Sequence, residues 1–294
     1  MKDLRTKGIV MILIGASMWG ASGTAVQFLF EFKHLTPPWL FMCRNIISGL
    51  FFLLYAYGKK ADLMMIWRKK EDRQSLLFFS VAGLLPSQYC YLKAIEYSNA
   101  ATATVIQYLM PVIILGWTLY KSRKRPDKTE VLAVGLAMLG TYLLVTKGRG
   151  DSLAISPQAL SWGIASAFAA AVYTISPRRI IRTYSSPIVI GWSMLLNGMV
   201  SNFVLDPWPF TGVMDGETLI ALAILIMLGS ILAFSFYLES TKYIPSTEVG
   251  ALSSVEPLAS VILAVVLLHV KLSLIEIIGM LCIISTVIIL ARKK

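Results

Sequence analysis

Charged residues are scarce in this sequence. Only 15% of its 294 residues are Asp, Glu, Lys or Arg, whereas soluble domains average about 25%. Apolar residues make up 56% of the chain, and the mean hydropathy is +0.70. This composition excludes an ordinary soluble domain and indicates a protein embedded in a membrane.

Cysteine and histidine are also rare. The three cysteines, Cys43, Cys90 and Cys282, lie singly in three different apolar runs, and the two histidines fall at expected helix ends. No metal-ligand spacing or disulfide framework is visible. We therefore expect neither a metal nor a cofactor.

Catalytic motifs are missing as well. The sequence has no Walker phosphate-binding loop, no HExxH and no GxSxG, the motifs of nucleotide hydrolysis, zinc proteolysis and serine hydrolysis. We do not expect an enzyme, nor the ATP-driven machinery of a pump.

Long apolar runs are abundant. A spanning helix needs about 20 mainly apolar residues, and lipid leaves only helices or closed barrels as spanning structures. Alternating strands of the barrel kind are absent. We therefore predict an all-α membrane protein with ten transmembrane helices, at about 8–30, 38–57, 75–95, 99–120, 128–146, 157–176, 184–205, 217–239, 243–268 and 273–291. The first run has a basic start like a signal peptide, but it is too long and has no cleavage site, so we expect it to be retained.

The net charge of +11 is unevenly distributed. With the N-terminus inside, 21 of the 27 lysines and arginines fall in inner segments, five fall in outer segments, and Arg44 lies within a helix. This bias fits the positive-inside rule. It predicts a multi-pass protein of the cell membrane with both termini cytoplasmic, and it explains the basic charge without a nucleic-acid partner.

An internal repeat relates the two halves. Residues 75–146 align without a gap onto 221–292, at a constant offset of 146, although only 8 of the 72 positions are identical. The evidence for the repeat is the kind of residue that coincides. Pro111 coincides with Pro257 inside an apolar run, and Glu130 coincides with Glu276 at the start of the next run. Such repeats are typical of secondary transporters.

The repeat is expected to be inverted. Five helices per half is an odd number, so the second half starts on the opposite side of the membrane from the first. We predict a first half over 1–146, a linker over 147–152 and a second half over 153–294.

These features resemble the EamA-type members of the drug/metabolite transporter superfamily. The matching residues are Trp19-Gly20 in the first helix, Arg44 a few residues after Pro38, the prolines of the fourth and ninth helices, and Glu256 before Pro257. One feature departs: relatives commonly end the fourth and ninth helices with a Gly-Glu pair, whereas this chain has YKSRKR at 120–125 and LLHVKL at 267–272. The resemblance implies export of amino acids or related metabolites, through a central cavity lined mainly by the first, third, fourth, sixth, eighth and ninth helices.

The paired prolines carry a physical consequence. Proline has no N–H, so Pro111 frees the carbonyl of Gln107, and Pro257 frees that of Ser253. In lipid such a carbonyl needs protein, water or substrate as a partner. A kink that only shapes packing is the alternative.

Glu256 is the principal candidate. It is expected 13 residues into a helix of about 26, near the bilayer midplane, on one face with Ser246, Ser253 and Ser260. An intramembrane carboxylate is costly unless paired. Its partner is a substrate ammonium, a transported proton or Arg44. The structural alternative is a hydrogen bond to Gln107 or to a serine.

Polar and aromatic groups of other helices complete the candidate site. Aromatic faces attract cations, although most aromatic residues in membrane helices pack or anchor. For Arg44 a structural role is favoured. We predict substrate binding by Trp19, Gln88, Tyr91, Gln107, Tyr173, Ser253 and Glu256, and a structural or gating role for Arg44, Pro111 and Pro257.

The sequence thus predicts a secondary active transporter of the cytoplasmic membrane that works by alternating access. Its expected partners are a small amphipathic solute and membrane lipid, and a coupling proton is left open. A channel or a lipid scramblase is the alternative.

Overall fold

The computed structural model describes residues 2–123, 125–147, 155–244, 249 and 252–292. Within these ranges the regular structure is helical and no strand occurs. The described first part contains α1 (Lys2–Glu31), α2 (Pro37–Gly58), α3 (Met65–Arg68), α4 (Lys70–Phe78), the π-helix η1 (Phe79–Leu84), α5 (Leu85–Glu96), α6 (Ala100–Gln107), α7 (Met110–Ser122) and α8 (Lys128–Thr146).

The described second part repeats much of this order. It contains α9 (Pro157–Ile175), α10 (Arg178–Thr183), α11 (Ser186–Val204), α12 (Gly216–Ala223), the π-helix η2 (Ile224–Leu232), α13 (Ala233–Ser240), α15 (Val255–Leu268) and α16 (Leu274–Arg292). Apart from Lys147, the predicted linker over 147–152 lies outside the described residues.

Eight helical segments of the described chain are long and apolar enough to cross a membrane. The third of them, Lys70–Glu96, is built from α4, η1 and α5. The last two predicted spans correspond to α15 and to most of α16, which are apolar but shorter. The all-α prediction is confirmed, while the count of ten spans stays a prediction.

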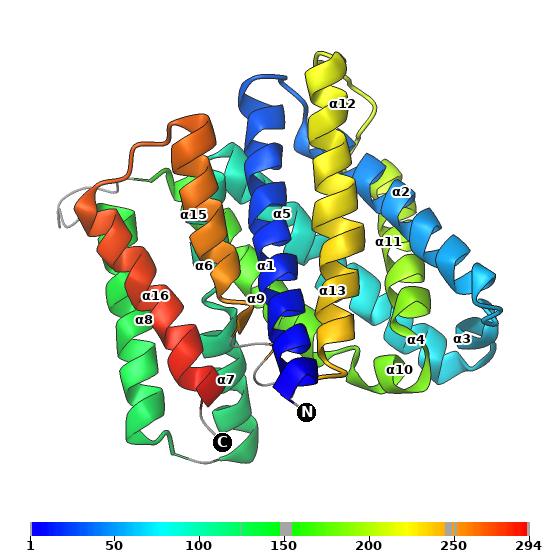
Figure 1. The fold of residues 1–294 in the computed structure, drawn as a ribbon, viewed down its shortest axis with the longest axis horizontal. Helices are drawn as coiled ribbons and strands as arrows, with labels where there is room; N and C mark the ends of the chain where they lie inside the picture. The colour runs from blue at the N-terminus through cyan, green and yellow to red at the C-terminus, as the bar shows by residue number, and fades with distance from the viewer. Residues whose placement is uncertain (1, 124, 148–154, 245–248, 250–251, 293–294) are drawn as a thin grey trace.

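The helices form one bundle with two flanking pairs (Figure 1). The pair α8–α16 lies on one flank and the pair α2–α11 on the other, with α1, α5, α6, α9, α13 and α15 between them. The beginning of α1 and the end of α16 lie at the same end of the bundle, here called the terminal end. The loop after α1 and the start of α12 lie at the opposite end, here called the Lys33 end.

Large apolar side chains are exposed on the outer helices. Leu54 of α2, Met138 of α8 and Ile220 of α12 are more than 60% exposed. Soluble proteins bury most such residues, so this surface suits contact with lipid.

The repeated glutamates are helix caps. Asp127 Oδ1 accepts from Glu130 N at 2.9 Å, and Glu130 Oε2 accepts from Asp127 N at 2.9 Å. Ser273 and Glu276 form the same reciprocal pair, with Glu276 Oε2 accepting from Ser273 N at 2.8 Å and Ser273 Oγ accepting from Glu276 N at 3.3 Å. Each pair satisfies backbone N–H groups that a helix start leaves open. The capping chemistry therefore recurs at the offset of 146.

Two glycines that coincide at this offset lie in π-helices. Gly83 belongs to η1, where an added Cβ would lie 3.1 Å from the Cα of Tyr173. Gly229 belongs to η2, where an added Cβ would lie 2.3 Å from the Cβ of Ser22. In each case the missing side chain lets the third helix of one half approach the first helix of the other.

Two predicted continuous helices are interrupted, and this corrects the expectation. The span predicted at 99–120 is divided into α6 and α7 by a turn at Tyr108 and Leu109. In the span predicted at 243–268, a turn at Ser253 and Ser254 precedes α15, and residues 245–248 and 250–251, including Ser246, lie outside the described part. Proline prefers the first turn of a helix, where no N–H is required.

The interruption also moves Glu256. It occupies the first turn of α15 and not the middle of a continuous 26-residue helix, while its depth in the bilayer stays a prediction. Pro111 is likewise the second residue of α7. Both prolines therefore start helical segments instead of kinking continuous ones.

Candidate functional site

Tyr108 connects the two interrupted segments. Its hydroxyl donates to Glu256 Oε2 at 2.9 Å and to the Ser253 carbonyl at 2.8 Å. One hydroxyl carries one proton, so the two acceptors share it. The turn between α6 and α7 is thereby tied to the beginning of α15.

The Ser253 carbonyl is the one that Pro257 was predicted to free. It accepts from Glu256 N at 2.9 Å as well as from Tyr108. Protein groups therefore satisfy this carbonyl. This partner could not be anticipated, because Tyr108 carries no signal in the sequence beyond being three residues before Pro111.

Arg44 points into the bundle. Its Nε donates to Ser230 Oγ at 2.9 Å, and the residue is only 8% exposed. In the described part of the chain its two Nη groups have no hydrogen bond or ion pair, although Glu256 and Tyr91 lie near enough to act on Arg44 electrostatically. Arg44 therefore neither extends to the lipid surface nor forms an ion pair with Glu256.

Tyr91 belongs to a chain of hydroxyl groups. Its Oη lies 2.7 Å from Thr104 Oγ1, which donates to Ser260 Oγ at 3.4 Å. Gly23 faces the same hydroxyl, because a Cβ there would come within 2.7 Å of it. The chain links α5, α6 and α15 beside α1.

The two predicted glutamines connect helices. Gln107 Nε2 donates to the Ser87 carbonyl at 3.3 Å, and Gln88 Oε1 accepts from Asn45 Nδ2 at 3.0 Å. The hydrogen bond considered between Gln107 and Glu256 is replaced by the one from Tyr108.

Two of the three predicted aromatic residues, Trp19 and Tyr173, lie in ring clusters. Trp19 packs edge-on against Phe234 with centroids 5.2 Å apart, and lies 5.5 Å from Tyr237. Tyr173 stacks on Phe79 with centroids 5.5 Å apart. Tyr173 and Tyr108 both lie near enough to Glu256 and Tyr237 for electrostatic interaction.

These contacts define a set of polar and aromatic residues between the halves. We call it the central cluster, and it comprises Trp19, Arg44, Tyr91, Tyr108, Tyr173, Tyr237, Ser253 and Glu256. Of the predicted binding residues, Gln88 and Gln107 fall outside it. Tyr108 and Tyr237 are members that the sequence did not predict. Tyr237 coincides with Tyr91 at the offset of 146, and this is the signal that could have found it.

Close packing of α1 against α15 explains the glycine in the Trp19-Gly20 pair. A Cβ at Gly20 would lie 2.7 Å from Ser260 N and 2.8 Å from the Glu256 carbonyl oxygen. The backbones of α1 and α15 therefore approach closely beside the central cluster, as small residues permit in membrane helices.

Two cavities lie outside the central cluster. The larger, about 530 Å³, is lined by Glu71, Gln74, Ser75, Phe78, Ser176 and Arg179. The smaller, about 440 Å³, lies among mostly apolar residues of α1, η2 and α15. In the described ranges no three His, Cys, Asp or Glu side chains are grouped as metal ligands.

Comparison with known proteins gives consistent results. The model of the EamA-like transporter family matches residues 6–146 and again residues 158–292. The uncharacterized inner membrane transporter YicL of Salmonella typhimurium is 38% identical over 288 residues, which cover 97% of this chain and 95% of that protein. The uncharacterized transporter YwfM of Bacillus subtilis is 23% identical over 272 residues, covering 90% and 86%.

A solved crystal structure has the same fold. It superimposes with a TM-score of 0.64 at 18% identity, covering 99% of this chain and 97% of the other. The apolar helices and these relatives identify a multi-pass integral membrane protein. The chain belongs to the EamA-like transporter family.

Proposed function

We propose that this protein is a secondary active transporter that carries a small zwitterionic organic solute, of the amino-acid type, by alternating access. The observation that carries the proposal is the pair of opposite charges in the central cluster. Arg44 is enclosed with unbonded Nη groups, and Glu256 is partly exposed without an ion pair in the described chain.

The chemistry of the two groups defines the ligand. A guanidinium binds a carboxylate through two parallel hydrogen bonds, and a carboxylate binds an ammonium. Tyrosine rings near Glu256 add attraction for a cation, worth about 0.5–2 kcal/mol. A molecule with both groups and an apolar body would satisfy the whole cluster.

The arrangement also supports alternating access. Arg44 and Tyr108 come from the first half, and Glu256 and Tyr237 come from the second. A ligand bound between halves can follow their relative motion, as in other inverted-repeat transporters. We propose export across the inner membrane, following the resemblance and the membrane named for the Salmonella relative. Glu256 is the candidate group for a coupling proton.

A thermal-shift series on the purified protein tests the ligand chemistry. The probes are an apolar amino acid, its amide without the carboxylate, and its N-acetyl derivative without the ammonium. A ligand at 100 times its dissociation constant stabilises by about 2.7 kcal/mol. We expect the parent amino acid to raise the melting temperature and both derivatives to raise it less.

Two variants assign the groups. Arg44→Gln should remove the preference for the amino acid over its amide, and Glu256→Gln should remove the preference over the N-acetyl derivative. Equal shifts in melting temperature for all three probes on the wild type would refute the proposal that the ligand is a zwitterion. Uptake of the stabilising amino acid into proteoliposomes then tests transport itself.

A further inference from the structure

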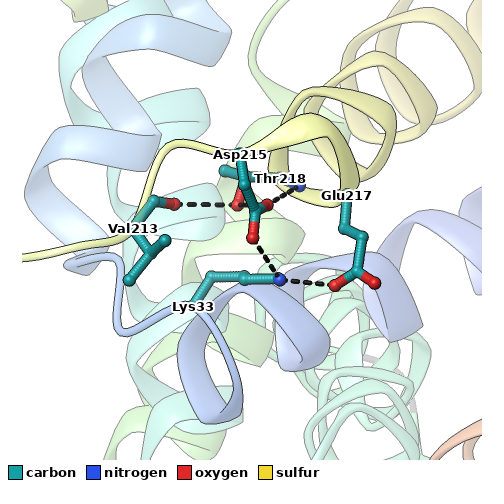
Figure 2. Close-up of polar contacts among 5 residues, drawn as sticks. All are labelled: Lys33, Val213, Asp215, Glu217 and Thr218. Atoms are coloured by element: carbon teal, nitrogen blue, oxygen red, sulfur yellow. Dashed lines mark hydrogen bonds and ion pairs between the residues drawn. The ribbon is translucent and has the colours of Figure 1, made fainter.

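A buried lysine joins the two halves at the Lys33 end. Lys33 Nζ lies 2.8 Å from Asp215 Oδ2 and 2.5 Å from Glu217 Oε2 (Figure 2). Lys33 follows α1, whereas both acids lie at the start of α12. Asp215 is held in place because its Oδ1 accepts from Thr218 N and Thr218 Oγ1, both at 2.9 Å.

The backbone reinforces this contact. Val213 N donates to the Lys33 carbonyl at 2.9 Å, and Thr211 Oγ1 donates to the His34 carbonyl at 3.3 Å. The loops after α1 and before α12 are therefore fastened together. We call Lys33, Asp215 and Glu217 the Lys33 latch.

A counterpart lies at the terminal end. Arg179 Nη1 lies 3.0 Å from Glu71 Oε2, and its Nη2 lies 2.8 Å from Asp72 Oδ1. Tyr184 Oη donates to Asp72 Oδ2 at 2.7 Å. We call Arg179, Glu71 and Asp72 the Arg179 latch.

The two latches have equivalent places in the two halves. Glu71 and Glu217 are 146 residues apart, and each lies in the first turn of the helix that begins the third span of its half. Lys33 follows the first helix of the first half, and Arg179 lies in α10, after the first helix of the second. Each latch therefore ties the first helix of one half to the third of the other, at opposite ends of the bundle (Figure 1).

Each latch combines one enclosed side chain with exposed partners. The Lys33 side chain is 10% exposed against 72% for Glu217, and Asp72 is 8% exposed against 83% for Glu71. An exposed ion pair contributes little, but removing the partner of an enclosed charge is costly. Breaking a latch therefore has a larger effect than breaking a surface pair.

The ionisation of the Lys33 latch agrees with this geometry. Hydrogen bonds to Asp215 and Glu217 raise the pKa of Lys33. Hydrogen bonds from Lys33 and from the Thr218 amide lower the pKa of Asp215 to about 2. Both groups are thus charged at neutral pH.

We infer that the two latches are the paired gates of this protein, each holding the central cluster closed toward its own end of the bundle. The inference rests on the proposed alternating access. Both latches are formed in this structure, and opening toward one end requires the latch at that end to break.

Chemical labelling from each side of the membrane tests the gates without any substrate. The reporter is Ser253→Cys in a background with Cys43, Cys90 and Cys282 replaced by Ala. A membrane-impermeant thiol reagent is added to either side of oriented vesicles, and Thr211→Cys identifies the side of the Lys33 end. We expect Lys33→Gln to accelerate labelling from the Lys33 side and slow it from the other, by roughly two- to tenfold.

The second latch should give the opposite result. Arg179→Gln should accelerate labelling from the terminal side and slow it from the Lys33 side. Glu217→Gln is the milder variant if Lys33→Gln folds poorly, since it keeps Asp215 and its helix cap. Lys33→Arg keeps the charge and should label like the parent.

A matched control removes another ion pair between the halves. Lys147 Nζ lies 3.2 Å from Glu276 Oε1, but it joins the flanking helices α8 and α16. Lys147→Gln should leave both labelling rates unchanged.

Unchanged rates in the latch variants, or changes in the same direction from both sides, would overturn the paired gates. Because the labelling uses no substrate, its result still tests the gates if the thermal-shift series shows that the ligand is not a zwitterion.

Discussion

At the residue scale, Glu256 illustrates how position within a helix determines the partner of a charge. In the first turn of α15 its carboxylate is favoured by the positive end of the helix dipole. Tyr108 supplies the hydrogen bond, and Arg44 interacts with it only over a longer distance. The carboxylate is therefore held in place without being neutralised by a protein cation.

The first prediction concerns this carboxylate. Glu256→Gln keeps the shape and removes the charge, so the protein should fold while transport falls at least tenfold, about 1.4 kcal/mol, or loses its pH dependence. The measurement is proteoliposome uptake across pH beside a thermal unfolding curve. Tyr108→Phe is the companion variant: it removes the donor, keeps the charge and should have a smaller effect. Parental transport with an unchanged pH profile would exclude Glu256 from the mechanism.

The second prediction concerns the pH range of the Lys33 latch. The pKa of Asp215 is lowered to about 2, so its contribution is present above its ordinary value of about 3.9 and is lost as the pH falls toward 2. The pKa of Lys33 is raised, so its contribution is present below its ordinary value of about 10.4 and is lost above it.

Between about pH 5 and 9 both groups keep their charges. Labelling of the reporter cysteine from the Lys33 side should therefore be constant over this range, once corrected for thiol ionisation with a free thiol. A change of severalfold near neutral pH would show that another titrating group controls this gate.

At the element scale, interruption of the helices matters more than their number. The breaks at 108–109 and 253–254 place a helix start beside the central cluster in each half. Discontinuous helices of this kind build the binding sites of several transporter folds. They also leave backbone groups, such as the Ser253 carbonyl, to be satisfied by groups of another helix, here the Tyr108 hydroxyl.

The third prediction concerns the prolines that start these segments. Pro111→Ala and Pro257→Ala restore an N–H and remove the bias toward a helix start. Transport should fall severalfold while stability changes by about 1 kcal/mol or less. Pro187→Ala is the control, because Pro187 is also the second residue of its helix, but α11 lies on a flank. Parental rates in both test variants would deny the prolines a mechanistic role.

The fourth prediction concerns the contact between α8 and α16. A Cβ at Gly140 would lie 2.6 Å from the Gly279 carbonyl oxygen, whereas Gly135 of α8 has nothing within 4 Å. Gly140→Ala should therefore destabilise by about 1–3 kcal/mol through overpacking, and Gly135→Ala should not. Thermal unfolding in detergent compares them, and equal melting temperatures would contradict the close approach.

At the scale of the whole molecule, the bundle is held together by contacts between its halves. The pairs α2–α11, α8–α16, α5–α9 and α1–α13 each join one helix from each half. Helices of the two halves pack against each other throughout the bundle, so a movement of one half changes its contacts with the other. Such an arrangement suits rocking between two states about a central site.

The fifth prediction concerns orientation. The charge bias places Arg68, in the short α3, on the cytoplasmic side. A cysteine at Arg68, in the same background without native cysteines, should react with an impermeant reagent only from the inside. Thr211→Cys should react only from the outside. Labelling of the Arg68 position from outside alone would reverse the predicted topology.

The sequence by itself determined the class of this protein and much of its helical plan. Apolar runs long enough to span a bilayer leave the backbone no other partner than itself, so helices follow from composition. The coincidence of Glu130 with Glu276 marked a helix start in each half, because a capping glutamate is favoured there for local reasons. The coincidence of Pro111 with Pro257 predicted a kink within a continuous helix, and the structure shows instead that both prolines start helical segments.

The tertiary structure decided which polar groups meet. Tyr108 reaches Glu256 across 148 residues of sequence, and Arg44 reaches Ser230 across 186. The hydropathy of a sequence does not indicate which residues far apart in the chain will be in contact. The breaks in the helices that bring these residues together depend on packing between helices. The charge count by itself placed Lys33 in an outer segment and Arg179 in an inner one, and it predicted a partner for neither. Their roles in the latches follow only from the acids that the fold places against them.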